Sequence, residues 1–248
     1  MNIDHESSLP LYHQIKEELL NQIESSILKE DEMIPSELEL QAIFKVSRPT
    51  VRQAISELIQ SGHLYRKRGI GTFVCKPRIE RDAQELLGFT EEMQRKGLKT
   101  FSIDINLQIG KPSKALASKL LIPEDNLVIT IKRLRFVNNE PIGIHTSHIP
   151  HNILSKITLN ELQGIQSLYQ LLKNRFSINL SYADEIIEAA LANEEEASLL
   201  LLDIGKPVLF VRRFVYSDRN DLIEMAEMVY PANRYKYHAR LIRKDIHK

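Results

Sequence analysis

Two arginines placed two positions apart could bind an anion. Residues 127–137 read LVITIKRLRFV, and a strand of this sequence turns Arg133 and Arg135 toward the same face as its odd-numbered apolar residues. The guanidinium groups would lie about 7 Å apart along the strand. A buried guanidinium needs an acidic partner or an anionic ligand, and its planar fork suits a phosphate or a carboxylate. Alternatively, the arginines reach solvent or pair with one of three acids: Asp184, Glu224 or Glu227.

A second group of residues could bind nucleic acid. Between Lys45 and Arg78 the chain has eight Lys or Arg residues and one acid, Glu57, whereas residues 1–44 have two Lys and ten Asp or Glu. A focused basic patch neutralises phosphates and supplies the sequence-independent part of DNA affinity.

The elements expected around this patch form a winged helix-turn-helix. Apolar residues at a spacing of four predict a first helix, and a capping box of Ser36 and Glu39 starts a second, short one. Ser47 caps a third helix that ends at Gly62, and two short strands then flank a turn that reads RKRGIG. This order places the third helix in the major groove of DNA.

The start of that third helix is where bases and phosphates would be contacted. Arg48, Thr50 and Arg52 lie there, and arginine can donate two hydrogen bonds to guanine. The Gly-x-Gly of the wing could instead suggest a nucleotide site, but no Gly-Lys-Ser/Thr follows, so none is expected. The alternative is a solvated basic hairpin beside an ordinary helix pair.

The rest of the chain predicts a second domain. A charged segment that contains Pro77 suggests a linker at 77–88. This linker would separate a DNA-binding domain at 1–76 from an effector-binding and dimerisation domain at 89–248. Strands and isolated helices without regular βαβ alternation favour a mostly antiparallel α+β domain. Helices are expected at 90–97 (capped by Thr90), 112–121, 166–175 and 194–202, and strands at 101–109, 127–137, 142–149, 182–191, 207–217 and 222–230.

Two further expectations concern this second domain. Alternation in its first strand places five apolar residues inward: Phe101, Ile103, Ile105, Leu107 and Ile109. The sequence shows no evident internal repeat.

Composition excludes several classes of protein. The 248 residues carry 33 basic and 33 acidic side chains, and no apolar run approaches the ~18 residues of a membrane span. The single cysteine, Cys75, cannot form an internal disulfide or a multi-cysteine metal cage. His145 and His148 point to opposite faces of a strand, so they do not predict a metal site with His151. We expect a cytoplasmic protein with no cofactor, no metal, no membrane partner and, lacking an evident nucleophile–base pair, no enzymatic activity.

The first domain resembles a known family. LYHQIKEELLNQI, PSELEL and VSRPTVRQAISELIQSGHLYRKRGIGTFV look like the DNA-binding domain of GntR transcription factors, over residues 9–75. The family pattern usually reads Pro-Ser-Glu-Arg, so Leu38 replaces an arginine that would contact DNA, which predicts lower affinity or an altered operator preference. The residues that the resemblance and the helix start assign to DNA contact are Ser36, Glu37, Ser47, Arg48, Thr50, Arg52, Arg66, Arg68, Gly69 and Gly71.

Residues 84–240 resemble the effector-binding (UTRA) domain of the HutC subfamily, whose fold is similar to chorismate lyase. The motifs that carry the likeness are FTEEM, IKRLR, SHIP, SLY and GKPVL. In sugar-phosphate-responsive members the phosphate is held by positions that match Phe89, Thr90, Arg133, Arg135, Ser167 and Tyr169. Glu224 and Tyr230 share a strand face and could bond ligand hydroxyls. His145 stands where we expect an acid in amino-sugar-phosphate responders, which leaves room for another phosphorylated sugar or sugar conjugate.

The two resemblances together imply a ligand-controlled regulator. We expect a repressor of a carbohydrate-uptake or catabolic operon, a homodimer formed by the second domain, and a palindromic double-stranded operator. The alternatives are a non-phosphorylated carboxylic acid effector of the urocanate type, a chorismate-lyase-like or phosphosugar-processing enzyme fused to a DNA anchor, and an architectural DNA binder without an effector.

Overall fold

The computed structural model describes residues 3–76, 78–155 and 157–241. The chain divides into two compact units, Met1–Arg78 and Ile79–Lys248. Within the described residues, no helix is long and apolar enough to cross a membrane.

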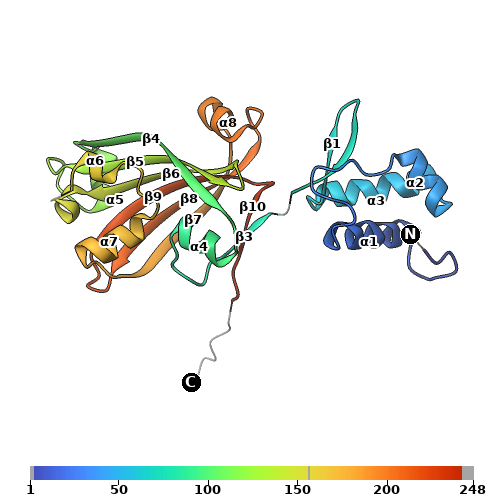
Figure 1. Ribbon diagram of the computed structural model, residues 1–248, viewed down its shortest axis with the longest axis horizontal. Helices are drawn as coiled ribbons and strands as arrows, with labels where there is room; N and C mark the ends of the chain where they lie inside the picture. The colour runs from blue at the N-terminus through green and yellow to red at the C-terminus, as the bar shows by residue number, and fades with distance from the viewer. Residues whose placement is uncertain (1–2, 77, 156, 242–248) are drawn as a thin grey trace, which may run out of the picture. The chain divides into compact units, whose positions relative to one another are not determined.

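The first unit is the predicted winged helix-turn-helix (Figure 1). Its elements are α1 (Leu11–Glu24), α2 (Glu37–Phe44), α3 (Arg48–Gln60), β1 (Leu64–Lys67) and β2 (Gly71–Val74). The capping box at the start of α2 is present: Ser36 Oγ accepts from the backbone N–H of Glu39, and Glu39 Oε2 accepts from that of Ser36 at 2.7 Å. Gly62 follows α3 with φ +79°, as a left-handed helix end requires.

The core of the first unit fixes the orientation of α3. Val51, Ile55 and Leu58 are buried on one side of this helix, against Ile15 and Leu19 of α1. The opposite side of α3 is therefore left to face a partner.

The second unit is built on one six-stranded antiparallel sheet of order β4-β5-β6-β9-β8-β7 (Figure 1). Its strands are β4 (Thr100–Gly110), β5 (Val128–Val137), β6 (Glu140–Pro150), β7 (Leu180–Leu191), β8 (Pro207–Ser217) and β9 (Leu222–Pro231). Its helices are α4 (Phe89–Arg95), α5 (Lys114–Leu120), α6 (Leu159–Leu162), α7 (Leu168–Phe176), α8 (Glu194–Leu200) and the 3₁₀ turn η1 (His151–Leu154). The predicted α+β class is confirmed.

Helices cover both faces of the sheet. Residues of α4, α6 and α7 pack on the face that carries Ile129, Ile131 and Tyr230. Residues of α5 and α8 pack on the other face, against Val128 and Leu134. The alternation predicted for residues 127–137 is therefore correct for this strand.

The start of the second unit differs from the expected linker at 77–88. Residues Ile79–Asp82 form β3, which pairs in parallel with β10 (Tyr235–His238), so the unit begins at Ile79. The expected cap also differs: Gly88 is the N-cap of α4, and Thr90 lies inside the helix, where its hydroxyl donates to the carbonyl of Gln166 at 2.7 Å.

The strand predicted at 101–109 is present as β4, but the prediction that its five apolar residues all point inward was wrong. A bulge between Asp104 and Asn106 shifts the register, so that Phe101 stacks on Phe136 on one face whereas Leu107 packs with the apolar cluster of the other face. β4 is also an edge strand, and Phe101, Ile103 and Ile105 are exposed.

The fold contains a structural repeat that the sequence did not show. An offset of 80 residues relates Lys114–Leu120 to Glu194–Leu200 and Arg133 to Arg213. β6 and β9 form the central strand pair, in which Ile144 faces Val229 and His148 faces Met225. The centre of this pairing is Thr146 opposite Glu227, so an offset of 81 residues relates β6 to β9. The unit therefore consists of two halves, β4–α5–β5–β6 and β7–α8–β8–β9, related by an approximate two-fold axis normal to the sheet.

Candidate ligand pocket and nucleic-acid interface

One cavity, partly open to solvent, lies in the second unit against the sheet face that α4 and α7 cover. The nine residues predicted to contact an effector come from five different elements and the residue before α7, and all nine line it: Phe89, Thr90, Arg133, Arg135, His145, Ser167, Tyr169, Glu224 and Tyr230. The fold thus brings together residues separated by as many as 141 positions, the distance from Phe89 to Tyr230.

Arg133 and Arg135 are buried in this cavity without an acidic partner. They are 1% and 5% exposed, and within the described residues neither forms an ion pair at 4.0 Å or less. Arg133 Nη1 donates to the carbonyl of Ile165 at 3.1 Å, and Arg135 Nη1 donates to Ser102 Oγ at 2.6 Å. The part of the chain that the structure describes offers no hydrogen-bond acceptor to Arg133 Nε, Arg133 Nη2 or Arg135 Nε.

The electrostatics of the two guanidinium groups are unfavourable without a counter-ion. Burial lowers the pKa of Arg133, and burial followed by repulsion from Arg133 lowers the pKa of Arg135 to about 9. Asp104 and Glu224 oppose these effects from beyond ion-pair distance. Unpaired buried cations are costly, so this part of the pocket is suited to an anion.

Two more arginines line the same cavity but are neutralised. Arg213 Nε donates to Glu185 Oε1 at 2.5 Å, and Arg81 Nη1 donates to Glu92 Oε2 at 2.7 Å. Arg81 also lies 3.5 Å from Glu185. Their charges are used within the protein, so we assign them to the structure of the pocket rather than to the ligand.

His145 provides a neutral, polar wall. Its ring packs edge-on against Phe89 and Tyr230, with centroid distances of 5.2 and 5.3 Å. Burial, and then the charges of Arg135 and Arg213, lower the pKa of His145 well below its ordinary value. Its Nε2 has no partner within the described residues and remains available for a ligand hydroxyl or carbonyl.

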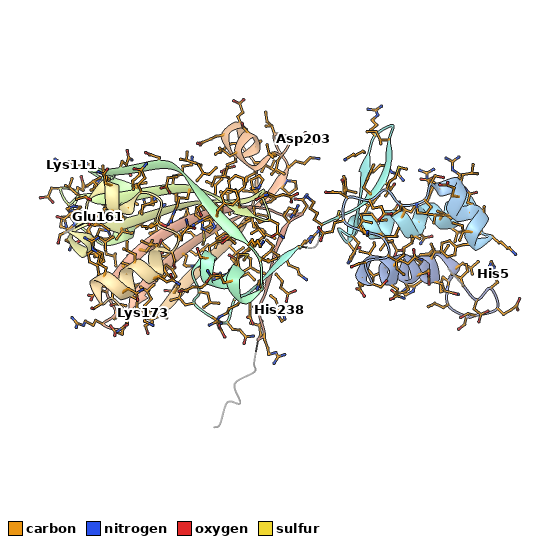
Figure 2. The ribbon with its side chains drawn as sticks, in the orientation of Figure 1. His5, Lys111, Glu161, Lys173, Asp203 and His238 are labelled. Atoms are coloured by element: carbon orange, nitrogen blue, oxygen red, sulfur yellow. The ribbon has the colours of Figure 1, made fainter. Side chains whose placement is uncertain are left out.

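The segment between α6 and α7 closes one side of the cavity. Ser167 is the N-cap of α7, where its hydroxyl accepts from the N–H of Gln170, and Gln166 also lines the pocket. Glu161 of α6, labelled in Figure 2, pairs with Arg175 in the last turn of α7 at 2.8 Å and links the two helices that flank this segment.

The first unit presents a basic surface at the start of α3 and on the wing. Arg48, Arg52, Arg66 and Arg68 are exposed. Glu37 accepts from Arg48 Nε at 3.3 Å and from Arg66 Nη2 at 2.9 Å, so one carboxylate links the helix to the wing.

The remaining residues predicted for DNA contact lie on the same surface. The hydroxyls of Ser47 and Thr50 are 2.7 Å apart, and Ser36 caps α2 beside Glu37. Gly69 at the wing tip has φ +76°, and Gly71 begins β2. Their positions fit contact with a phosphate backbone and with base edges.

Comparison with known proteins identifies this arrangement. The model of bacterial regulatory proteins of the gntR family matches residues 11–74, and the UTRA domain matches residues 95–236. The chain belongs to the GntR family. As a member with a UTRA domain, it is a transcriptional regulator and not an enzyme, with operator DNA as the partner of its first unit and a small-molecule effector as the partner of its second.

Several relatives of this GntR protein match along most of their length. The HTH-type transcriptional repressor NagR of Bacillus subtilis is 38% identical over 237 residues, which cover 96% of this chain and 97% of NagR. A probable fructoselysine utilization operon transcriptional repressor of Escherichia coli is 29% identical over 93% of this chain and 94% of its own. The crystal structure of PhnF from Mycobacterium smegmatis shares the fold, with a TM-score of 0.64, 24% identity and coverage of 94% of this chain and 100% of PhnF.

The sequence did not point to Arg81, Glu92 or Arg213 as pocket residues, or to Glu185 as the partner of Arg213. Arg212 and Arg213 read as an adjacent basic pair, and only the strand register shows that the second of them is buried. The signal that could have found it is the similarity of VRRF at 211–214 to IKRL at 131–134 in this GntR chain.

Proposed function

We propose that this protein is a repressor of a carbohydrate uptake or catabolism operon, and that a phosphorylated sugar or sugar derivative alters its binding to the operator. The observation that carries the proposal is the pair of buried guanidinium groups, Arg133 and Arg135, that face one cavity without acidic partners. Two unpaired cations match the charge of a phosphate dianion better than that of a single carboxylate.

The rest of the pocket suits a sugar attached to that phosphate. Ser167 and Tyr169 bring hydroxyls to the cavity, and among the described residues Glu224 Oε2 and His145 Nε2 are buried without a hydrogen-bond partner. Phe89 and Tyr230 add aromatic walls. Hydroxyl groups of a ligand would satisfy the unpaired atoms, since burying polar groups without partners is costly.

We further propose that the protein acts in the cytoplasm as a homodimer on a palindromic operator. Both edges of the sheet expose apolar side chains, Ile103 and Ile105 on β4 and Ile187 and Leu191 on β7. Apolar edge strands favour cover by another copy of the chain. A dimer would place two α3 helices on two half-sites. The effector must bind the DNA-incompetent state more tightly, because equal affinity would shift nothing.

Thermal unfolding with sugar phosphates, their unphosphorylated parents and small carboxylic acids tests the effector. A ligand at about 100 times its dissociation constant adds about 2.7 kcal/mol of stability and raises the melting midpoint. We expect a phosphosugar to do this, and the shift to be lost in both Arg133→Ala and Arg135→Ala. A response to carboxylic acids alone would replace the proposal by a urocanate-type effector.

Selection of bound duplexes from a random pool tests the DNA side. We expect a palindromic sequence whose enrichment is lost in Arg48→Ala and Arg52→Ala. Leu38 is 76% exposed at the start of α2, so Leu38→Arg should change the preferred bases without unfolding the unit.

A further inference from the structure

Asp104 occupies the position from which an acid could neutralise Arg133. In the register of β4 with β5, Asp104 lies directly opposite Arg133, and in the register of β7 with β8, Glu185 lies directly opposite Arg213. Glu185 reaches its arginine, at 2.5 Å from Nε. Within the described residues, Asp104 forms no ion pair, although its charge acts on Arg133.

The carboxylate of Asp104 is instead bonded to the segment that closes the pocket. Asp104 Oδ2 accepts from the backbone N–H of Gly164 at 2.9 Å. The two residues that follow are held from the pocket as well, because Arg133 Nη1 donates to the carbonyl of Ile165 and Thr90 Oγ1 donates to that of Gln166. Residues 163–167 thus form a strap held by three hydrogen bonds, one each from β4, β5 and α4.

Two features keep Asp104 away from Arg133. Its side chain is one methylene shorter than that of Glu185, and the bulge between Asp104 and Asn106 changes the local direction of β4. The corresponding irregularity in β7 lies between Leu180 and Tyr182, away from Glu185.

We propose that Asp104 is a positioning residue of the effector pocket, which holds the 163–167 strap against the cavity through Gly164 and thereby leaves the Arg133 guanidinium for an anionic ligand. The part that concerns the ligand rests on the proposed function. The part that concerns the strap stands without it.

Two substitutions at this position should have opposite effects on anion binding. Asp104→Glu keeps the charge and adds the methylene that lets Glu185 reach Arg213, so it should pair with Arg133 and weaken binding of inorganic phosphate at least about tenfold. Asp104→Asn keeps an oxygen for the Gly164 N–H but removes the charge that competes for Arg133, so it should tighten binding by about threefold. Calorimetric titration of the full-length protein measures both, with Asp125→Glu on an exposed turn as the control.

The strap has its own readout in the ligand-free protein. Amide hydrogen exchange at residues 163–167 should accelerate in Asp104→Ala and stay near the wild-type rate in Asp104→Asn. Equal exchange in all three proteins overturns the positioning role. The proposal that Asp104 leaves Arg133 available to an anion is overturned by either of two results. One is a loss of phosphate affinity in both Asp104→Glu and Asp104→Asn, and the other is wild-type affinity in both. A wild-type protein that binds phosphate compounds nowhere overturns the proposed effector and leaves the exchange result to decide the strap.

Discussion

The half of the sheet formed by β4, β5 and β6 and the half formed by β7, β8 and β9 each bury an arginine at the same position of the repeat. In the second half Arg213 is neutralised at 2.5 Å by Glu185. In the first half the corresponding acid, Asp104, bonds a backbone N–H, and among the described residues Arg133 has no acidic partner within 4.0 Å. Equivalent arginines therefore have different electrostatic surroundings. The position of the nearest acid, rather than the arginine itself, distinguishes a structural cation from one available to a ligand.

Other positions near the two-fold axis differ in the same asymmetric way. The 81-residue offset relates Gly143 to Glu224 and His145 to Ala226, and all of these except Gly143 line the cavity. The repeat therefore supplies one scaffold twice, but the side chains on it build a single pocket with one cationic end.

Removing the acid of the paired half should give the largest effect on stability. Glu185→Gln leaves Arg213 and Arg81 buried without one of their counter-ions, and we expect a loss of about 3–5 kcal/mol in the free energy of unfolding. Urea denaturation measures this loss. Glu188→Gln, on an exposed site of the same strand, should change stability by less than about 0.5 kcal/mol. A loss below about 1 kcal/mol for Glu185→Gln would contradict the assignment of Arg213 as a neutralised structural cation.

Removing Arg133, the arginine without an acidic partner among the described residues, should not lower the stability of the ligand-free protein. Arg133→Met eliminates a buried charge that has no acidic partner, so the ligand-free protein should keep its stability or gain about 1 kcal/mol. The same change should weaken phosphosugar binding about 100-fold, or about 2.7 kcal/mol. The matched variant Arg213→Met should destabilise the ligand-free protein instead. Comparable losses in both variants would show that the two halves are not different in this respect.

Local signals in the sequence predicted most of the elements. Ser36 and Glu39 form the expected capping box, and Gly62 has the positive φ of the expected helix end. The alternation around Arg133 gave the correct face because β5 is a central strand with both faces covered. In each case the information lies within a few neighbouring residues.

Features that depend on distant residues were missed. β3 and β10 are four-residue strands that pair only because the chain returns 156 residues later, from Ile79 to Tyr235. The alternation of β4 could not show the bulge after Asp104, and adjacent Arg212 and Arg213 gave no sign that one of them pairs with Glu185. The repeat itself is a match of register rather than of residue identity, so the sequence alone did not reveal it.

Adding a side chain at Gly143, the glycine of the first half that corresponds to Glu224, should lower the free energy of unfolding less than breaking a buried ion pair. A Cβ added at Gly143 would lie 2.8 Å from Tyr230 Cδ1 and 3.2 Å from the carbonyl of Val229. The Tyr230 ring cannot easily move, since it stacks on Tyr235 with a centroid distance of 3.9 Å. We therefore expect Gly143→Ala to lower the free energy of unfolding by about 1–3 kcal/mol. Gly110→Ala, where a Cβ meets nothing within 4 Å, is the control, and equal stability of the two variants would argue against this contact.

The smallest predicted effect is the contribution of His145 to the pH dependence of stability. His145 occupies the position that Ala226 occupies in the second half. Burial holds the pKa of His145 well below 6.5 in the folded protein, so the folded state stays neutral while the unfolded chain takes up a proton near pH 6.5. The unfolded state then binds more protons below that pH, and stability should fall there by up to about 1.4 kcal/mol per pH unit. Burial also lowers the pKa of His148. His148 therefore contributes equally to the slope of stability against pH in the wild type and in His145→Gln. Urea denaturation at several values between pH 5.5 and 7.5 should give a shallower slope for His145→Gln than for the wild type, and parallel slopes would show that His145 accepts a proton in the folded state.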